Sequence, residues 1–117
     1  MSLVKDQAEF LLDVCKLVEF ATQNGFVLTG GELERKIEMQ EIYIRTGRSK
    51  TMNSMHLKKC AIDLNFFKDV GGRLQLTYDI QALKPIGDFW ENLRAQKNSW
   101  GGNWNSFKDV PHFERKV

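Results

Sequence analysis

The stretch "NSMHLKKCAIDLNFF" (residues 53–67) places a histidine and an aspartate within sequence that otherwise resembles a β-strand. In its second half polar and apolar residues alternate, with Asp63 and Asn65 on one face of the expected strand. His56 precedes this strand, at the end of a polar segment that we interpret as a loop. The offset of seven between His56 and Asp63 is odd, so a regular strand would direct them to opposite faces. The two side chains can therefore converge only if the chain bends between them.

A second segment, "WGGNWNSFKDVPHFE" (residues 100–114), again combines an aspartate with a histidine, and the chain has only two histidines. Asp109 and His112 are three residues apart, which places both side chains within one tight turn. Glu114 follows two residues after His112 and lies on the same face if this segment is extended. Its carboxylate is then placed to accept a hydrogen bond from the His112 ring and orient it.

Together the two segments contain the residue types of a hydrolytic zinc site. Such a site needs three nitrogen or oxygen ligands, an open fourth position for water, and a general base beside that water. The two histidines and one aspartate can supply the ligands, and the second aspartate remains for the base. The spacing alone leaves a second interpretation open, in which the two histidines are ordinary polar residues that never meet.

The rest of the chain mixes helical and strand patterns. The first helix has apolar residues at a spacing of three and four, which are Phe10, Leu11, Val14, Cys15, Val18 and Ala21. In the second helix we expect Ile37, Ile42 and Tyr43 to point inward. The pattern predicts helices over residues 4–24, 32–46 and 86–96, strands over 26–29, 60–67, 74–78 and 112–117, a Gly-Gly hairpin turn within 68–73, and a loop over 98–111. Since no βαβ alternation is present, we predict an α+β fold with a small antiparallel sheet.

The bulk properties indicate one globular domain over residues 1–117. Hydrophobic residues make up 42% of the chain and charged residues 27%, and the net charge of +2 is too small to favour a nucleic-acid partner. No apolar run approaches the roughly 20 residues of a membrane span. Charged residues interrupt the N-terminal apolar pattern, so we expect no signal peptide and synthesis in the cytoplasm. Cys15 and Cys60 are expected to be free thiols that serve as small core residues.

The same segments resemble a known family. "SMHLKKCAIDL" resembles the Ser-x-His-x6-Asp motif of the D-alanyl-D-alanine carboxypeptidase-type zinc peptidases, which include VanY-type enzymes and phage L-alanyl-D-glutamate endopeptidases. "WGGNWNSFKDVPHFE" resembles their second motif, a Trp-Gly-Gly-x-Trp run that leads to Asp-x-x-His-Phe-Glu. "GGELERKIEMQEIYIRTGRSKTMNSMH" resembles the upstream part of the phage branch. The resemblance runs in the same order from about residue 28 to residue 114. It implies the hedgehog/DD-peptidase fold, a small antiparallel sheet with flanking helices.

The resemblance also implies roles for individual residues. His56, Asp63 and His112 would be the ligands of one Zn²⁺ per chain, and Asp109 would be the general base. Glu114 would support the His112 ring from behind.

The implied substrate contacts are placed less directly. Arg35 would match the family arginine that steadies the carbonyl oxygen or a substrate carboxylate, with Arg45 and Arg48 as rival candidates. Ser54 would hydrogen-bond the substrate backbone. Trp100 is expected to pack the long loop against the core, and it is also a candidate wall of the substrate groove. Lys59 departs from the pattern, because family members often have glycine three residues after the first histidine.

The function implied is a single-domain zinc peptidase that acts on the stem peptide of bacterial peptidoglycan. The phage-like resemblance favours an L-Ala-D-Glu endopeptidase of endolysin type over a D-Ala-D-Ala carboxypeptidase. Such a monomer would reach the cell wall after its release from the host cytoplasm. The alternative is a zinc-binding but non-hydrolytic interaction domain of the hedgehog-like superfamily. Asp109 favours the enzyme, since a purely structural metal site needs no base beside the water.

Overall fold

The computed structural model describes residues 2–31, 33, 36–47 and 54–117. The elements in chain order are α1 (Leu3–Gln23), β1 (Val27–Gly30), α2 (Ile37–Arg45), the 3₁₀ turn η1 (Met55–Lys58), β2 (Ala61–Val70), β3 (Arg73–Thr77), α3 (Ile80–Leu93), β4 (Asn98–Trp100), the 3₁₀ turn η2 (Gly101–Asn103) and β5 (His112–Arg115). The predicted α+β class and small antiparallel sheet are confirmed. None of the described helices is both long and apolar enough to cross a bilayer.

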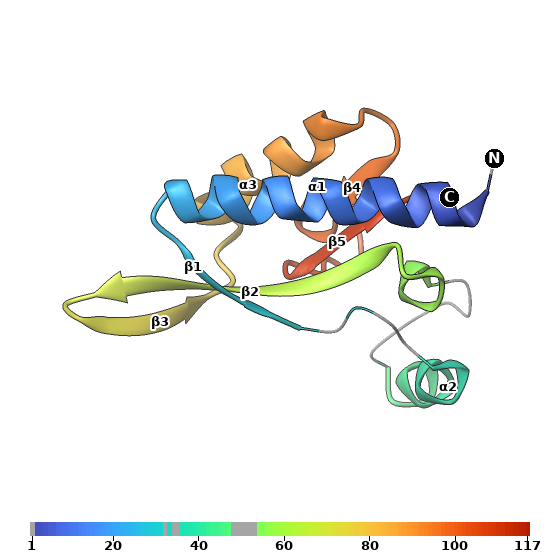
Figure 1. Cartoon of the computed structure of the whole chain (residues 1–117). Helices are drawn as coiled ribbons and strands as arrows, with labels where there is room; N and C mark the ends of the chain where they lie inside the picture. Colours follow the sequence, from blue (N-terminus) through green and yellow to red (C-terminus); the bar gives the residue numbers. More distant parts are fainter. Residues whose placement is uncertain (1, 32, 34–35, 48–53) are drawn as a thin grey trace.

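The long strand β2 organises the sheet (Figure 1), whose strand order is β1-β2-β5-β4 with every pairing antiparallel. The first residues of β2 pair with β5, and its distal half pairs with β3 in a hairpin. Gly71 and Gly72 form the hairpin turn with φ values of 60° and 83°. Two consecutive positive φ angles are what a type I′ turn requires, so the predicted Gly-Gly hairpin is confirmed.

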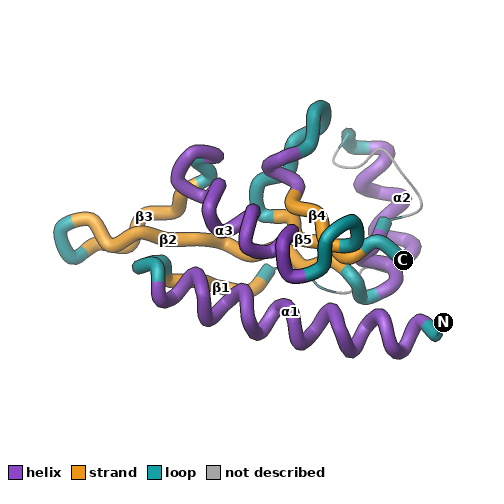
Figure 2. Tube along the Cα trace, turned by 90° about the horizontal axis from the view of Figure 1, so that it is seen from above, coloured by secondary structure: helices purple, strands orange, loops and turns teal. Residues whose placement is uncertain are grey.

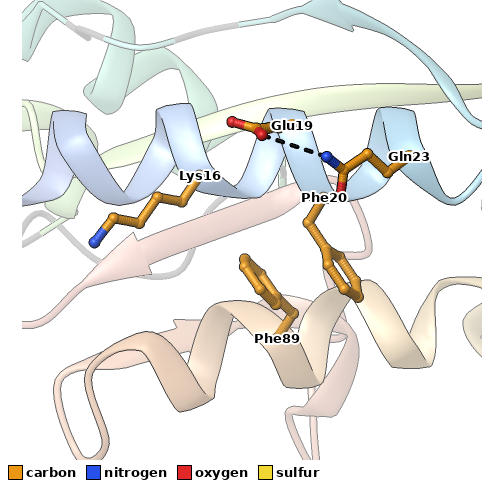
Figure 3. A pocket seen from close by; sticks show the side chains of 5 residues that line it. All are labelled: Lys16, Glu19, Phe20, Gln23 and Phe89. Atoms are coloured by element: carbon orange, nitrogen blue, oxygen red, sulfur yellow. Dashed lines mark hydrogen bonds between the residues drawn. The ribbon is translucent and has the colours of Figure 1, made fainter.

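One face of the sheet is covered by α1 and α3, as Figures 1 and 2 show from two directions. Leu64 and Phe66 of β2 point toward these helices, in one hydrophobic cluster that extends from α1 to β5. Nearer the C-terminal end of α1, the rings of Phe20 and Phe89 stack at 4.0 Å between the two helices (Figure 3). Because the core lies on this side, the other side chains of β2 are directed to the opposite face.

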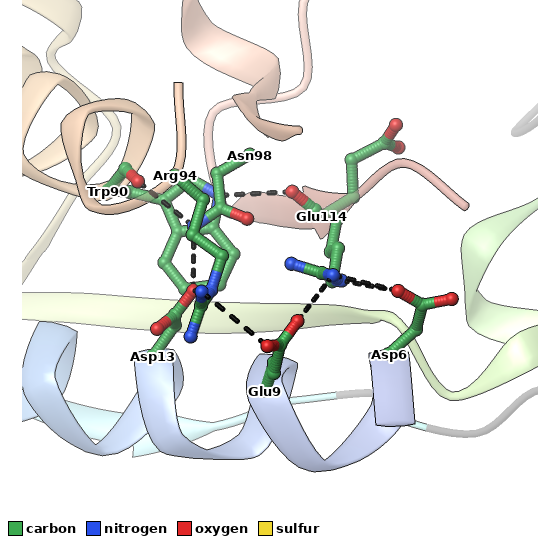
Figure 4. Close-up of polar contacts among 8 residues, drawn as sticks. Asp6, Glu9, Asp13, Trp90, Arg94, Asn98 and Glu114 are labelled. Atoms are coloured by element: carbon green, nitrogen blue, oxygen red, sulfur yellow. Dashed lines mark hydrogen bonds and ion pairs between the residues drawn. The ribbon is translucent and has the colours of Figure 1, made fainter. Parts of the chain in front are cut away.

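The inward face of α1 differs from the predicted one. Its buried residues are Phe10, Asp13, Val14, Leu17 and Ala21. Leu11 is 59% exposed, and Cys15 is exposed while Cys60 is buried, so the prediction of two core thiols was wrong for Cys15. The helix turns Asp13 inward because its carboxylate accepts hydrogen bonds from Arg94 at 2.9 Å and Asn98 at 3.1 Å (Figure 4). Hydrophobic spacing could not predict a buried aspartate.

The second helix is shorter than predicted, beginning at Ile37, and lies on the other side of the sheet from α1 (Figure 1). Ile37 is 59% exposed and Ile42 is 39% exposed, whereas Gln40 is fully buried. The expectation that the two isoleucines point inward was therefore wrong. The buried residue of α2 is the polar Gln40, so a search for periodic apolar residues does not identify this face.

The helix α3 begins six residues before the predicted start and contains Pro85. Asp79 caps its first turn by accepting a hydrogen bond from the Gln81 backbone N–H at 3.1 Å. Pro85 has no N–H to donate to the Gln81 carbonyl, but Gln81 is exposed, so water can satisfy that group. The segment predicted as a loop over 98–111 also contains the buried strand β4, which pairs with β5.

Candidate metal centre

The pairing of β2 with β5 brings Asp63 and His112 together. They are direct cross-strand partners, so their side chains lie on the same face of the sheet, opposite the face that carries Leu64 and Phe66. The Asp63 Oδ1 atom lies 3.4 Å from Nδ1 of His112. The register of β2 and β5 therefore places Asp63, from the first sequence segment, next to His112, from the second.

The bend that His56 needs is provided by the turn before β2. Ser54 caps η1, and its hydroxyl accepts a hydrogen bond from the His56 backbone N–H at 3.2 Å. Lys59 ends the turn in the left-handed conformation, with φ 57° and ψ 36°. This reversal brings His56 Nε2 to 3.3 Å from Asp63 Oδ1. The chain reversal at one left-handed residue, a conformation that glycine adopts most readily, thus reconciles the odd offset of seven.

The three predicted ligands form a compact group in which one atom from each side chain lies within 4.8 Å of the others. The imidazole rings of His56 and His112 are 5.0 Å apart and inclined at 70°. Both histidine side chains are almost fully buried, while that of Asp63 is 29% exposed. The group therefore opens to solvent on the aspartate side.

Each imidazole is oriented by an acceptor at its far nitrogen. His56 Nδ1 lies 3.1 Å from the Leu33 carbonyl oxygen, and His112 Nε2 lies 2.7 Å from Glu114 Oε1. Both partners accept hydrogen bonds, so each of these nitrogens carries the proton of the neutral ring. The nitrogens that face Asp63 are then left with lone pairs, which is the tautomer that a metal ligand requires.

The electrostatics of the group depend on the aspartate between the two rings. Burial would raise the pKa of Asp63, but the rings of His112 and His56 that flank its carboxylate outweigh burial and hold this pKa far below the usual range. Burial would likewise lower the pKa of His112, yet the neighbouring carboxylates of Asp63 and Glu114 raise this pKa to about 9. Without a metal, a proton on His112 therefore balances the carboxylates.

The donor set fits a zinc ion. The Asp63 Oδ1 atom is buried and makes no hydrogen bond of acceptable geometry with the described residues, although two ring nitrogens flank it. Such a carboxylate oxygen is costly to bury unless a cation compensates it. Two imidazole nitrogens and one carboxylate oxygen are a ligand set found in catalytic zinc sites, which keep a fourth position for water.

Asp109 borders this group on the solvent side. Its Oδ2 atom lies 3.9 Å from His112 Nδ1, and its side chain is 38% exposed. The His112 backbone N–H donates to the Asp109 carbonyl at 3.1 Å, which closes the predicted tight turn. The Trp104 ring leans on the His112 ring at 5.1 Å and forms another boundary of the site. A carboxylate thus lies beside the three candidate ligands without being buried among them.

The remaining predicted site residues fall in different places. Arg35 and Arg48 lie outside the described residues, and Arg45 is exposed at the end of α2. Ser54 is mostly buried and caps the turn that carries His56. Trp100 is fully buried in the core, so its expected place on a substrate groove is corrected. Its ring is enclosed because β4 is buried against α3, where a loop had been predicted.

Two contributors to the site were missed in the sequence. The Leu33 carbonyl is a backbone group, and no side-chain pattern could have revealed it. Glu91, on α3, accepts a hydrogen bond from the Trp100 backbone N–H at 2.9 Å. Its position in a helix beside Trp90 gave no signal beyond that of an ordinary charged residue.

Comparisons with known proteins agree with this geometry. Residues 47–115 match the family model described as D-alanyl-D-alanine carboxypeptidase. The chain is 32% identical over 103 residues to the L-alanyl-D-glutamate peptidase of Listeria phage A118, covering 85% of this chain and 34% of the phage protein. It thus spans about a third of that relative's length. The fold resembles the crystal structure of Serratia marcescens L-Ala D-Glu endopeptidase ChiX, with a TM-score of 0.67, 22% identity, and coverage of 89% of this chain and 78% of that one. The chain belongs to the D-alanyl-D-alanine carboxypeptidase family.

Proposed function

We propose that the chain is a zinc-dependent peptidase that hydrolyses the stem peptide of bacterial peptidoglycan, and that residues 1–117 act as one catalytic domain. The observation that carries the proposal is the convergence of His56, Asp63 and His112 on one point beside Asp109. The single hydrophobic cluster from α1 to β5 supports one domain. The name of the phage relative supports cleavage between L-Ala and D-Glu.

In this proposal His56, Asp63 and His112 would hold the zinc ion. The chemistry that zinc supplies in such a ligand set is polarisation of the scissile carbonyl and a lower pKa of the attacking water, about 7. Asp109 takes a proton from this water as it attacks the carbonyl carbon, and returns the proton to the leaving amine. Leu33 and Glu114 keep the two rings oriented throughout.

Apart from Trp100, the proposed substrate contacts are those expected from the sequence. Arg35 or Arg48 would bind the carbonyl oxygen or a substrate carboxylate, a task suited to a guanidinium. Ser54 would contact the substrate backbone beside His56, at the edge of the site that its turn already supports. Peptidoglycan is the proposed partner, and the proposed site of action is the cell wall after release of the protein.

The test is mass spectrometry of purified peptidoglycan after incubation with the zinc-loaded protein. We expect new amino termini at D-Glu, and we expect Asp109→Asn to lower kcat by about 10²- to 10⁴-fold, since this is the usual contribution of a general base. The variant should still bind one zinc ion, because Asp109 is not among the three ligands.

Other outcomes would redirect the proposal. Loss of single D-Ala residues would identify a carboxypeptidase within the same family. If wild type and Asp109→Asn both bound zinc and both left several wall chemotypes intact, the enzymatic role would be wrong. A non-hydrolytic, zinc-binding interaction domain would then be the better description.

A further inference from the structure

Glu91 is a partly buried carboxylate that the proposed reaction does not use. Its Oε2 atom accepts the Trp100 backbone N–H at 2.9 Å, and its Oε1 atom accepts the Asn103 side-chain amide at 3.0 Å. These two donors stand at the beginning and the end of the turn η2. Glu91 projects from α3, which packs in the core, so its two hydrogen bonds fasten η2 to a rigid element. We call these two bonds, to Trp100 and Asn103, the Glu91 clasp.

The turn that Glu91 clasps is in direct contact with the backbone of Asp109. The Gly101 carbonyl accepts the backbone N–H of Asp109 at 3.1 Å and that of Trp104 at 3.3 Å. The Trp100 indole N–H donates to the Val110 carbonyl at 2.7 Å. A Cβ on Gly101 would overlap the Asp109 carbonyl, so only glycine permits this close approach of the two backbones. The position of Asp109 therefore follows that of the turn.

The chemistry of the clasp requires a carboxylate. Both partners of Glu91 are N–H donors, and an ionised carboxylate can accept at both oxygens. A glutamine in its place would set its own NH₂ group against one of these donors and lose that bond. Lys84 completes the arrangement by donating to the Asn103 side-chain oxygen at 2.8 Å, which fixes the orientation of the Asn103 amide.

We propose that Glu91 is a positioning residue for hydrolysis, which acts through η2 to hold Asp109 against the metal centre. The inference rests on the proposed function of Asp109 as general base. Misplacement of a catalytic group by about 1 Å can cost about 100-fold in rate, so we expect Glu91→Gln to lower kcat by about 10- to 100-fold. KM and zinc stoichiometry should not change, since Glu91 touches neither the ligands nor the site opening.

The experiment compares Glu91→Gln, Asn103→Ala, Asp109→Asn and the Glu91→Gln/Asp109→Asn double variant with the wild type. Glu19→Gln is the matched control, because it makes the same chemical change at an exposed residue of α1, whose carboxylate accepts a hydrogen bond from Gln23 of the same helix (Figure 3). For each zinc-loaded protein, kcat and KM on a stem-peptide fragment, zinc content and Tm are measured. Asn103→Ala removes one of the two bonds to Glu91 without setting a donor against a donor, so it should give a smaller loss of kcat than Glu91→Gln.

Amide hydrogen exchange separates this inference from the proposed function. In Glu91→Gln the amides of Asp109 and Trp104 should exchange faster than in the wild type, with Glu19→Gln unchanged, whether or not any substrate is cleaved. The double variant should be no slower than Asp109→Asn alone, because the clasp acts through Asp109. Wild-type kcat with unchanged protection in folded Glu91→Gln and Asn103→Ala would overturn the inference. The inference would also be overturned if Glu91→Gln lowered kcat by the same factor in the Asp109→Asn variant as in the wild type. Loss of bound zinc in Glu91→Gln would overturn it too.

Discussion

The proton on His112 is the single-residue feature that most affects the metal centre. Glu114 and Asp63 approach opposite nitrogens of this ring, and together they raise its pKa to about 9 in the metal-free protein. A zinc ligand must present a lone pair at Nδ1, so zinc and the second ring proton compete for the same atom. His112 thereby links metal affinity to pH.

Zinc affinity should rise with pH. The raised pKa means that His112 is protonated at pH 7, and this proton leaves when zinc binds. Between about pH 7 and pH 9 we expect the affinity to increase about tenfold per pH unit, and to level off above. Titration against a competing chelator measures it. Glu114→Gln should lower the pKa of His112 and move the plateau to lower pH, whereas a pH-independent affinity would contradict the assignment.

Lys59 offers a second test at this scale, because its φ of 57° disfavours any residue with a Cβ. Lys59→Gly and Lys59→Ala both remove the long side chain, so the difference between them isolates the Cβ. We expect the glycine variant to be more stable than the alanine variant by about 1 kcal/mol, measured by urea unfolding. Equal stabilities would show that the left-handed turn before β2 is not strained.

At the scale of elements, the contact between α3 and β4 is built around one indole. The Trp100 ring lies against the backbone of Gly87 in α3 and of Gly102 in η2. Both glycines allow an approach that a Cβ would prevent. This packing buries β4 and seats η2, and through η2 it supports the turn that carries Asp109. The glycine in the middle of α3 is therefore explained by packing, against the usual helical preference for alanine.

Gly87→Ala should destabilise the protein even though alanine is the better helix former. The added Cβ would overlap the Trp100 ring, and overpacking of this kind costs about 1–3 kcal/mol. Gly30→Ala is the control, because a Cβ there would meet nothing within 4 Å, and its effect should stay within about 0.5 kcal/mol. Urea unfolding compares the two. A stabilised Gly87→Ala would show that Trp100 can move away without cost.

For the whole molecule, a partly buried polar network joins the two ends of the described chain (Figure 4). Arg115 of β5 is fully buried and donates to Asp6 at 2.7 Å and to Glu9 at 2.6 Å. Arg94, the residue that follows the last residue of α3, forms ion pairs with Glu9 and Asp13 of α1. The network anchors α1 to the strand that also carries His112. The metal centre and the N-terminal helix are thus attached to opposite faces of one β-strand pair.

Arg115→Met should destabilise the protein by about 2–3 kcal/mol, because it leaves two carboxylates facing an apolar side chain. This loss is smaller than the roughly 3–5 kcal/mol usual for a fully buried ion pair, since Asp6 and Glu9 are partly exposed and water can reach them. Arg73→Met changes an exposed arginine of β3 in the same way and should have an effect within about 0.5 kcal/mol. Chemical unfolding measures the free energy of unfolding of both variants. Equal decreases in Arg115→Met and Arg73→Met would refute a stabilising role for the network.

The sequence by itself determined the fold class, the hairpin and the set of residues that converge on the metal centre. Alternation along β2 and the Gly-Gly turn are local signals, and local signals are visible in one sequence. The resemblance to a known family joined the two segments, which spacing alone had left separate. Polar residues that point inward were invisible, because a buried aspartate such as Asp13 or a buried glutamine such as Gln40 has no periodicity of its own.

Only the tertiary structure decided how the site is held. The register that pairs Asp63 with His112, the left-handed Lys59, the carbonyl of Leu33 and the clasp of Glu91 all join atoms from distant parts of the chain. Such contacts depend on how whole elements pack, and the same residue types would be equally plausible at the surface. A sequence states which groups are available for chemistry, whereas packing determines their distances, and chemistry at the site depends on the distances.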